Sequence, residues 1–346
     1  MTVRRLRVLE IGGVAAILLA VVSGCAAESP TPGATGDGSG YASGYRPPAP
    51  TELAPLRGTT IPAGSLTRPS LAAKVDNHEE ARPQLGLERT DLVFEELVEG
   101  GITRYVAIWH SELPDEVGPV RSIRPMDPDI ITPFGGIVAY SGGQEQFVEM
   151  MMATPVFNAV FDYDDTGLFY RDDVHDSPHD VIVKAAELVG RHLDLPSPGQ
   201  QFAYSSVAAS ATPALDGAPT SSVQLRFSDA RWPGWSWDSA GQQWLRSQEG
   251  QPDLDDAGTQ LRATNVLTLR VGIDWSYGEV PKTVMVGGGE AWVSTGGKTS
   301  HGTWSKDAAG GVIRVVDDNG VTMRLAPGNT WIELVPDDQG SVEITP

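Results

Sequence analysis

The chain has 346 residues, with 45 acidic and 25 basic side chains, and its formal net charge at pH 7 is −20. Because nucleic-acid binding relies on Lys and Arg to neutralise phosphates, this charge argues against a nucleic-acid partner. It also argues against a folded part that lies flat on anionic lipid.

The first residues have the pattern of an export signal. Arg4, Arg5 and Arg7 precede a short apolar run over residues 11–22, and small residues then lead to Cys25. A membrane-spanning helix needs about 20 apolar residues, so the run predicts a signal peptide over residues 1–24. The alternative is an uncleaved anchor helix, which Glu10 and the small residues disfavour.

Cys25 is the only cysteine of the chain, so it cannot form an internal disulfide in an exported protein. Lipid attachment explains it better, and the residues 22–25 (VSGC) match the bacterial lipobox. We therefore expect lipidation of Cys25, which would make the membrane a partner and hold the protein at the extracytoplasmic face of the cell membrane. Export by Sec or by Tat stays open. Cleavage before Cys25 would remove three basic residues and one acidic residue, which changes the net charge to −22.

Residues 26–67 are rich in Pro, Gly, Ser and Thr and poor in large apolar side chains. Such a segment buries too little apolar surface to offset the entropy lost on ordering. The interpretation is that the lipidated Cys25 and a disordered tether occupy residues 25–67.

Residues 68–204 mix strand and helix patterns and predict an α/β domain. The segment 91–100 fits either periodicity and is left open. Strands are expected at 71–76, 103–111 and 135–143, and helices at 144–153 and 178–193, the second begun by Pro178.

A loop or short linker is expected at 205–222, and hairpin-spaced strands without helical periodicity follow it over 223–346. The fold class is therefore α+β, with a mixed α/β N-terminal domain before an antiparallel β-rich C-terminal domain. Each half is long enough to have its own core.

Several blocks of the sequence resemble the YerB-type bacterial lipoproteins, a family catalogued as a domain of unknown function. The blocks are DN (76–77), ARPQ (81–84), VEGGITR (98–104), GPVRSIR (118–124), FYR (169–171), SPH (177–179), ATN (263–265), GTW (302–304) and PGNTW (327–331). The resemblance implies the same organisation and location and names no reaction. Asp180 departs from it, since that pattern usually has Asn there.

Arginine is concentrated in these blocks, at Arg82, Arg104, Arg121 and Arg124. Guanidinium groups bind carboxylates and phosphates with two parallel hydrogen bonds, which lysine cannot do. We therefore predict a binding site for an anionic envelope glycan. The alternative is internal pairing with acidic residues; the candidates are Asp91, Glu95, Glu96 and Glu99.

The predicted site also includes Ser141, Arg171 and His179. Ser141 follows a predicted strand and precedes a predicted helix, where backbone N–H groups favour anions. Two other interpretations are open, in which Ser141 is the helix cap or is the nucleophile of a hydrolase with His179.

Two acid–base hypotheses concern catalysis. His179 has the pKa range of a proton-transfer group, and Glu95, Glu96 and Glu99 offer a carboxylate pair of the kind that glycan hydrolysis uses. A solvated helix face is the plainer interpretation of these glutamates.

No cofactor is expected from the sequence, although one loop offers candidate ligands for Ca²⁺. Asp162, Asp164, Thr166 and Asp173 have the spacing of oxygen ligands in a calcium loop. A zinc site on His175 and His179 is disfavoured, because Pro178 between them breaks the helical geometry that would align them.

Four tryptophans lie in one predicted hairpin, at Trp232, Trp235, Trp237 and Trp244. We expect core packing for them, with stacking on sugar rings as the alternative. Trp304 and Trp331 are expected in the core.

Three functions remain from the sequence. The first is binding of an anionic cell-envelope glycan or a lipid-linked precursor. The second is a hydrolase or transferase that acts on cell-wall glycans. The third is a scaffold whose β domain docks an envelope protein.

Overall fold

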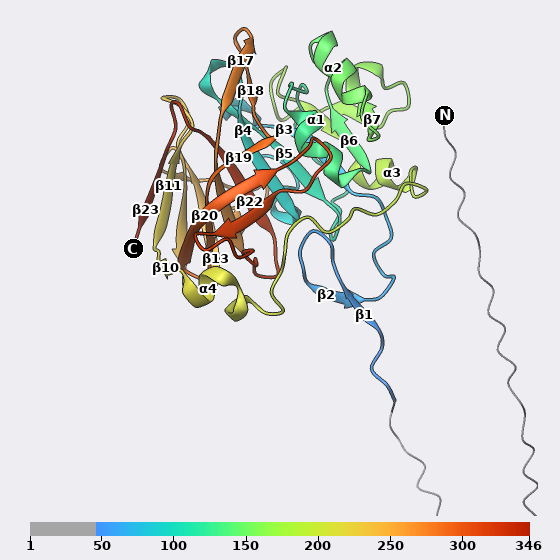
Figure 1. Ribbon diagram of the computed structural model, residues 1–346. Helices are drawn as coiled ribbons and strands as arrows, with labels where there is room; N and C mark the ends of the chain where they lie inside the picture. The colour runs from blue at the N-terminus through green and yellow to red at the C-terminus, as the bar shows by residue number, and fades with distance from the viewer. Residues whose placement is uncertain (1–45) are drawn as a thin grey trace, which may run out of the picture. The chain divides into compact units, whose positions relative to one another are not determined.

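The structure is a computed structural model that describes residues 46–346, of which Ala49–Pro346 form one compact unit (Figure 1). The predicted signal peptide and Cys25 lie outside the described residues. Within the described part, no helix has both the length and the apolar character needed to cross a membrane.

A mixed sheet runs through the folded unit and contains eleven strands within residues 46–346. In spatial order the strands are β10 (Ala218–Pro219), β20 (Lys298–Lys306), β19 (Gly287–Thr295), β16 (Asn265–Val271), β22 (Thr330–Pro336), β4 (Leu92–Leu97), β5 (Thr103–Trp109), β3 (Leu71–Asp76), β6 (Ile137–Tyr140) and β7 (Phe157–Val160), with β21 (Arg314–Asp317) beside β20.

This sheet joins the two halves of the chain. Strand β22 from the C-terminal half pairs in parallel with β4 from the N-terminal half, and Figure 1 shows the red β22 beside the cyan β4 and β5. The structure therefore differs from the predicted pair of domains with separate cores. The predicted linker 205–222 is also part of the fold, since it contributes β10 to the sheet and a short helix, α4 (Thr212–Asp216).

A second sheet of six strands comes from the C-terminal half, and its strands are β14 (Gln251–Pro252), β13 (Gln243–Gln248), β12 (Pro233–Asp238), β11 (Ser222–Arg226) and β23 (Ser341–Thr345), with β15 (Arg262–Ala263) beside β13. The two-stranded pairs are β1 (Thr51–Leu53) with β2 (Thr60–Pro62), β8 (Phe169–Arg171) with β9 (Val181–Val183), and β17 (Ile273–Tyr277) with β18 (Val280–Thr283). The remaining helices are α1 (Asp127–Ile131), α2 (Glu145–Met152) and α3 (Ala185–Gly190). The coarse α+β fold class is confirmed.

Two hydrophobic cores lie on the two faces of the large sheet, because side chains alternate between faces along a strand. One core contains Phe94 and Val106 together with Phe147 of α2. The other contains Tyr105 and Trp331 together with residues of the six-stranded sheet.

The predicted tether is shorter than expected, because its last part belongs to the folded unit. Ala54 and Leu56 are fully buried, and the Tyr204 hydroxyl donates a hydrogen bond of 2.6 Å to the Leu56 carbonyl oxygen. Arg57 Nε lies 2.6 Å from Asp91 Oδ1. The composition of the segment did not indicate these contacts, because only two apolar side chains and one arginine make them.

The prediction of a long helix over 178–193 is wrong in its first half. Val181–Val183 form strand β9, and helix α3 spans only Ala185–Gly190. The run of β-branched residues pairs with Phe169–Arg171, and this pairing outweighs the helical spacing. The strands predicted at 71–76, 103–111 and 135–143 and the helix at 144–153 are confirmed, and the open segment 91–100 contains strand β4.

Core packing is confirmed for most of the tryptophans. Trp235 and Trp244 are fully buried, and Trp304 and Trp331 are nearly so. Trp237 is partly buried and packs against the same core, whereas Trp232 is 45% exposed.

One buried ionic network connects the two sheets. Arg246 of β13 is fully buried and donates hydrogen bonds to Glu95 Oε2 (2.6 Å), Glu333 Oε1 (3.0 Å) and Asp253 Oδ2 (2.8 Å). Its guanidinium also lies 4.6 Å from the centre of the Trp331 ring. Burial, and next the charge of Glu95, raise the pKa of Glu333 well above its usual range. The network therefore favours a protonated Glu333 beside one cation and two carboxylates.

His110 gives the folded unit a predicted sensitivity to acid. Its side chain is buried, and burial lowers its pKa to about 4. The unfolded chain takes up this proton near pH 6.5, so stability should fall as the pH drops from about 6.5 to about 4. Protonation of His110 should lower the free energy of unfolding by up to about 3 kcal/mol over this pH range.

We expect His110→Gln to remove that part of the pH dependence. The measurement is urea unfolding of residues 26–346, which retain every described residue, at pH 7 and at pH 4.5. An equal loss of stability in the variant and in the natural chain would contradict the assignment to His110.

Candidate functional site

The candidate site lies at one edge of the large sheet, where β3, β4 and β6 end and the antiparallel β5 begins. The strand register places Arg104 of β5 directly between Asp76 of β3 and Glu96 of β4. Opposed residues on neighbouring strands point to the same face, so this edge collects charged side chains beside one core. Ligands of open sheets commonly bind beyond the carboxyl ends of the strands.

Asp76 is the centre of this edge. It is 1% exposed, and its Oδ2 atom lies 2.6 Å from His179 Nδ1 and 3.2 Å from Arg121 Nε. His179 comes from the loop before β9, and Arg121 also donates a hydrogen bond of 3.0 Å to the Pro178 carbonyl oxygen. One buried carboxylate therefore orients both a histidine and an arginine.

Arg104 is the least compensated cation of the group. It is 6% exposed, no carboxylate oxygen of residues 46–346 lies within 4.0 Å of it, and its buried Nε has no hydrogen-bond partner there. In the described part of the chain its one side-chain hydrogen bond goes to the Ser122 carbonyl oxygen, at 3.3 Å. Burial, and next the charge of Arg124, lower the pKa of Arg104 to about 10.

Backbone hydrogen bonds hold the remaining arginines beside the Ser141 turn. Ser141 N–H donates to the Arg121 carbonyl oxygen at 3.1 Å, and Ile123 N–H donates to the Gly142 carbonyl oxygen at 2.9 Å. Arg124 Nε lies 2.8 Å from Glu99 Oε2. The structure thus brings Arg104, Arg121, Arg124 and Ser141 into one region, and Arg124 has the internal acidic partner that the alternative interpretation required.

Ser141 has neither of its two alternative roles in this geometry. Helix α2 begins at Glu145, so Gln144 occupies the cap position, and no side chain caps the helix. No hydrogen bond joins the Ser141 hydroxyl to a histidine within the described part of the chain, and His179 bonds to Asp76 instead.

Two predicted ligand residues lie elsewhere. Arg82 donates to Asn77 Oδ1 at 3.1 Å and lies 3.6 Å from Glu249, in the turn between β13 and β14. Arg171 forms an ion pair with Asp180, the residue that departs from the family pattern. Both arginines therefore have internal partners outside the Asp76 group.

The structure separates the glutamates proposed as an acid–base pair. Glu95 is fully buried in the Arg246 network, on the opposite face of the sheet from Asp76 and Arg104. Glu96 is also buried and forms an ion pair with Lys74, and Glu99 pairs with Arg124. The plainer interpretation, a solvated helix face, is wrong for Glu95 and Glu96, because both lie buried in strand β4. Their side chains point to opposite faces of the sheet, so these two carboxylates do not form the hypothesised pair.

The calcium candidates do not converge. Asp164 Oδ1 accepts hydrogen bonds from the backbone and hydroxyl of Thr166, at 3.0 and 2.6 Å, and so closes its own turn. Asp162 lies against Gly142, whereas Asp173 lines a different cavity. Within residues 46–346 the three carboxylates are not among the groups whose ligand atoms come close together.

A different group does converge beside Asp76. One ligand atom from each of His78, Glu80 and His179 lies within 4.8 Å of the other two. The rings of His78 and His179 stack, with centroids 4.4 Å apart and 14° between their planes. Among the described residues, these three side chains form the group of His, Asp and Glu donors whose ligand atoms converge.

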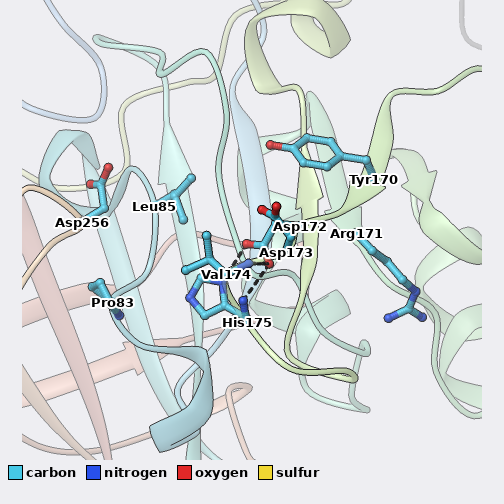
Figure 2. Close-up of a pocket in the computed structure, with 9 residues that line it drawn as sticks. All are labelled: Pro83, Leu85, Tyr170, Arg171, Asp172, Asp173, Val174, His175 and Asp256. Carbon is cyan, nitrogen blue, oxygen red and sulfur yellow. Dashed lines mark hydrogen bonds and ion pairs between the residues drawn. The ribbon is translucent and has the colours of Figure 1, made fainter.

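A cavity of about 640 Å³ lies next to the loop of His175 (Figure 2). His175 Nδ1 is 2.7 Å from Asp172 Oδ2, and its buried Nε2 has no partner in the described chain. Of the predicted arginines only Arg171 reaches the lining, and Figure 2 shows its guanidinium directed away from the Asp172–His175 pair. This acidic cavity does not fit an anionic ligand, so the candidate site is the Asp76 edge.

Sequence reasoning missed Asp76, His78 and Glu80 as site residues. Asp76 and His179 are 103 residues apart in the chain, and no spacing rule relates them. The available signal was the DN block at 76–77, which belongs to the family pattern and ends a predicted strand.

Comparison with known proteins supports the resemblance seen in the sequence. A family described as "Protein of unknown function (DUF3048) N-terminal domain" matches residues 58–194, and its C-terminal domain counterpart matches residues 223–332. These two segments lie within or close to the predicted halves of the chain, although one sheet joins them in space.

The relatives agree with the family match. "Putative lipoprotein YerB" of Bacillus subtilis (strain 168) is 29% identical over 298 residues, which covers 82% of this chain and 86% of that protein. A crystal structure of the YerB protein from Bacillus subtilis matches with a TM-score of 0.73 at 24% identity, covering 84% of this chain and 99% of that one. The fold is thus shared with a solved structure. This agrees with the resemblance to the YerB-type lipoproteins. Because the two family segments together span more than half of the sequence, the chain belongs to the DUF3048 family.

Proposed function

We propose that this protein is a lipoprotein of the extracytoplasmic face of the cell membrane that binds an anionic envelope glycan or a lipid-linked glycan precursor. The ligand's phosphate or carboxylate would bind at Arg104, Arg121 and Arg124 beside the Ser141 turn. The lipid on Cys25 would hold the protein near such ligands.

The lipoprotein part of the proposal rests on the sequence and on the relative's name. The residues 22–25 match a lipobox, and the B. subtilis relative is named a lipoprotein. The net charge of −20 keeps the folded unit from adsorbing to anionic lipid by itself, so an anchor would be needed to keep it at the membrane.

Arg104 is the observation that carries the binding part. A buried guanidinium without a carboxylate partner is costly, and a bound anion would supply the missing partner. Arg121 is 21% exposed and Arg124 10% exposed in their side chains, so the group is accessible from one side. The uncapped start of α2 adds backbone N–H groups beside Ser141.

Binding is favoured over glycan hydrolysis because the carboxylates suggested for hydrolysis lie apart. Glu95 faces the interior of the sheet sandwich, and Glu99 is paired with Arg124. A glycosidase needs its two carboxyl groups on either side of one glycosidic bond.

Arg104→Met tests the proposal, because methionine keeps much of the apolar stem and removes the charge. Without ligand, we expect the free energy of unfolding to stay within about 1 kcal/mol of the natural value, since burial already disfavours the charge. With ligand, we expect about 10- to 150-fold weaker binding, the effect of losing a hydrogen bond to a charged group.

The measurement is a thermal-shift titration of residues 26–346 with poly(glycerol phosphate), muropeptides and a neutral glycan. Arg314→Met is the matched control, because Arg314 is 66% exposed and, within residues 46–346, its one ion pair is with the exposed Asp307. Equal shifts for Arg104→Met and Arg314→Met, or no shift with any anionic glycan, would refute the proposed site.

A further inference from the structure

We infer that His78, Glu80 and His179 bind a divalent transition-metal ion of the zinc type. His78 and Glu80 come from the turn that follows β3, and His179 comes from the loop that precedes β9. The inference does not rest on glycan binding at Arg104, Arg121 and Arg124, because a metal ion would bind other side chains. Of its three ligands only His179 also belongs to the glycan site predicted from the sequence.

The distances between the donor atoms are close to those of a metal site. His179 Nε2 lies 3.4 Å from Glu80 Oε2, and His78 Nδ1 lies 3.8 Å from the same oxygen. Zinc–ligand bonds of about 2.0–2.2 Å in a tetrahedral arrangement separate neighbouring ligands by roughly 3.4 Å. His78 Nδ1 also accepts a hydrogen bond of 3.2 Å from the Glu80 backbone N–H, so the His78 ring has to turn and release this bond to place the three donors around one ion.

The types of donor fit zinc. Two imidazoles and one carboxylate form the three-ligand set of open zinc sites, which leave a further position for water or another ligand. Glu80 is 63% exposed in its side chain, so solvent has access to this position. His78 is 33% exposed and has room to turn its ring out of the stacked position.

Asp76 supplies the supporting contact that metal-bound histidines usually have. Its buried Oδ2 accepts a hydrogen bond from His179 Nδ1 at 2.6 Å. A carboxylate on one ring nitrogen fixes the tautomer in which the other nitrogen has a free lone pair for the metal. The unprotonated His179 Nε2 then faces the Glu80 carboxylate. Both groups offer lone pairs and no hydrogen, so a cation between them would bind to both.

The charges around the three proposed ligands favour a bound cation. Three nearby arginines are engaged with acidic partners, since Arg121 contacts Asp76, Arg231 contacts Glu79 at 3.0 Å, and Arg82 lies 3.6 Å from Glu249. Glu80 has no arginine or lysine within 4.0 Å among the described residues; its recorded ionic contacts are to His78 and His179. Its negative charge is therefore free to neutralise part of the charge of a divalent ion.

The test is zinc binding by tag-free residues 26–346, measured by competition with a chromogenic chelator. We expect one zinc ion per chain and at least tenfold weaker binding in His78→Gln, in Glu80→Gln and in His179→Gln. Substitution with Co²⁺ should give the strong visible absorption of a four- or five-coordinate site.

His301→Gln is the matched control, because His301 also lies between two carboxylates, at 2.9 Å from Glu290 and 2.7 Å from Asp318. Circular dichroism of each variant verifies folding, and the exposed position of Glu80 makes Glu80→Gln the variant least able to perturb the fold. Zinc binding that is absent, or that is equal in Glu80→Gln and His301→Gln, would overturn the inference. Because zinc alone is the probe, that result would leave glycan binding to be judged by its own titration.

Discussion

Replacing Arg246 with methionine will lower the free energy of unfolding by about 3–5 kcal/mol. Arg246 is the only cation that contacts the three buried acidic groups Glu95, Asp253 and Glu333 within residues 46–346. Without it, these groups stay in the interior with no opposite charge. Removing one partner of a buried ionic network leaves uncompensated charges in the interior. The resulting loss in the free energy of unfolding is larger than the change expected if apolar residues replaced the whole network.

Glu333→Gln is the matched control for this prediction. The pKa of Glu333 is raised well above its usual range, so the side chain is already predisposed to be neutral, and an amide reproduces its shape. For Glu333→Gln we expect the free energy of unfolding, measured with urea on residues 26–346, to change by no more than about 1 kcal/mol. A loss for Arg246→Met as small as that for Glu333→Gln would show that the network does not hold the two sheets together.

Replacing Cys25 with alanine will release the protein from the membrane. The proposed lipid provides about 0.8 kcal/mol of membrane affinity per buried methylene, and an acidic folded unit offers no electrostatic attraction in its place. We expect metabolic labelling with palmitate to disappear in Cys25→Ala, and the processed protein to move from the membrane fraction to the soluble fraction.

Ser23→Thr is a useful companion to this variant, because it keeps the cysteine and alters a neighbouring small residue of the same motif. It should retain palmitate labelling. If Cys25→Ala stays in the membrane at the size of the natural protein, and the natural protein carries no label, then an uncleaved anchor helix is the correct interpretation.

Local patterns were sufficient for most of the first half of the fold. The alternation in 71–76, the apolar run in 103–111 and the helical spacing in 144–153 predicted β3, β5 and α2. These patterns report which face of an element is buried, and that is a property of neighbouring residues. The segment 178–193 failed because pairing with a distant strand decided the conformation of Val181–Val183.

The candidate site was predictable only as a set of residue types. Arg104, Arg121 and Arg124 were identified as arginines in family blocks, and the structure does bring them together with Ser141. Arg82 and Arg171 have the same residue type but different partners, which no property of the sequence distinguished. Burial and charge pairing depend on how segments pack, so a list of arginines cannot separate ligand-binding side chains from structural ones.

The family and the order of strands and helices along most of the chain could be read from the sequence alone, which also predicts the export and lipidation signals. Only the tertiary structure decided that β22 lies beside β4, that Glu95 faces Arg246, and that His179 bonds to Asp76 across 103 residues. The reason is physical. Targeting motifs and periodicity are carried by contiguous residues, whereas contacts between distant segments form when the whole chain buries its apolar surface at once.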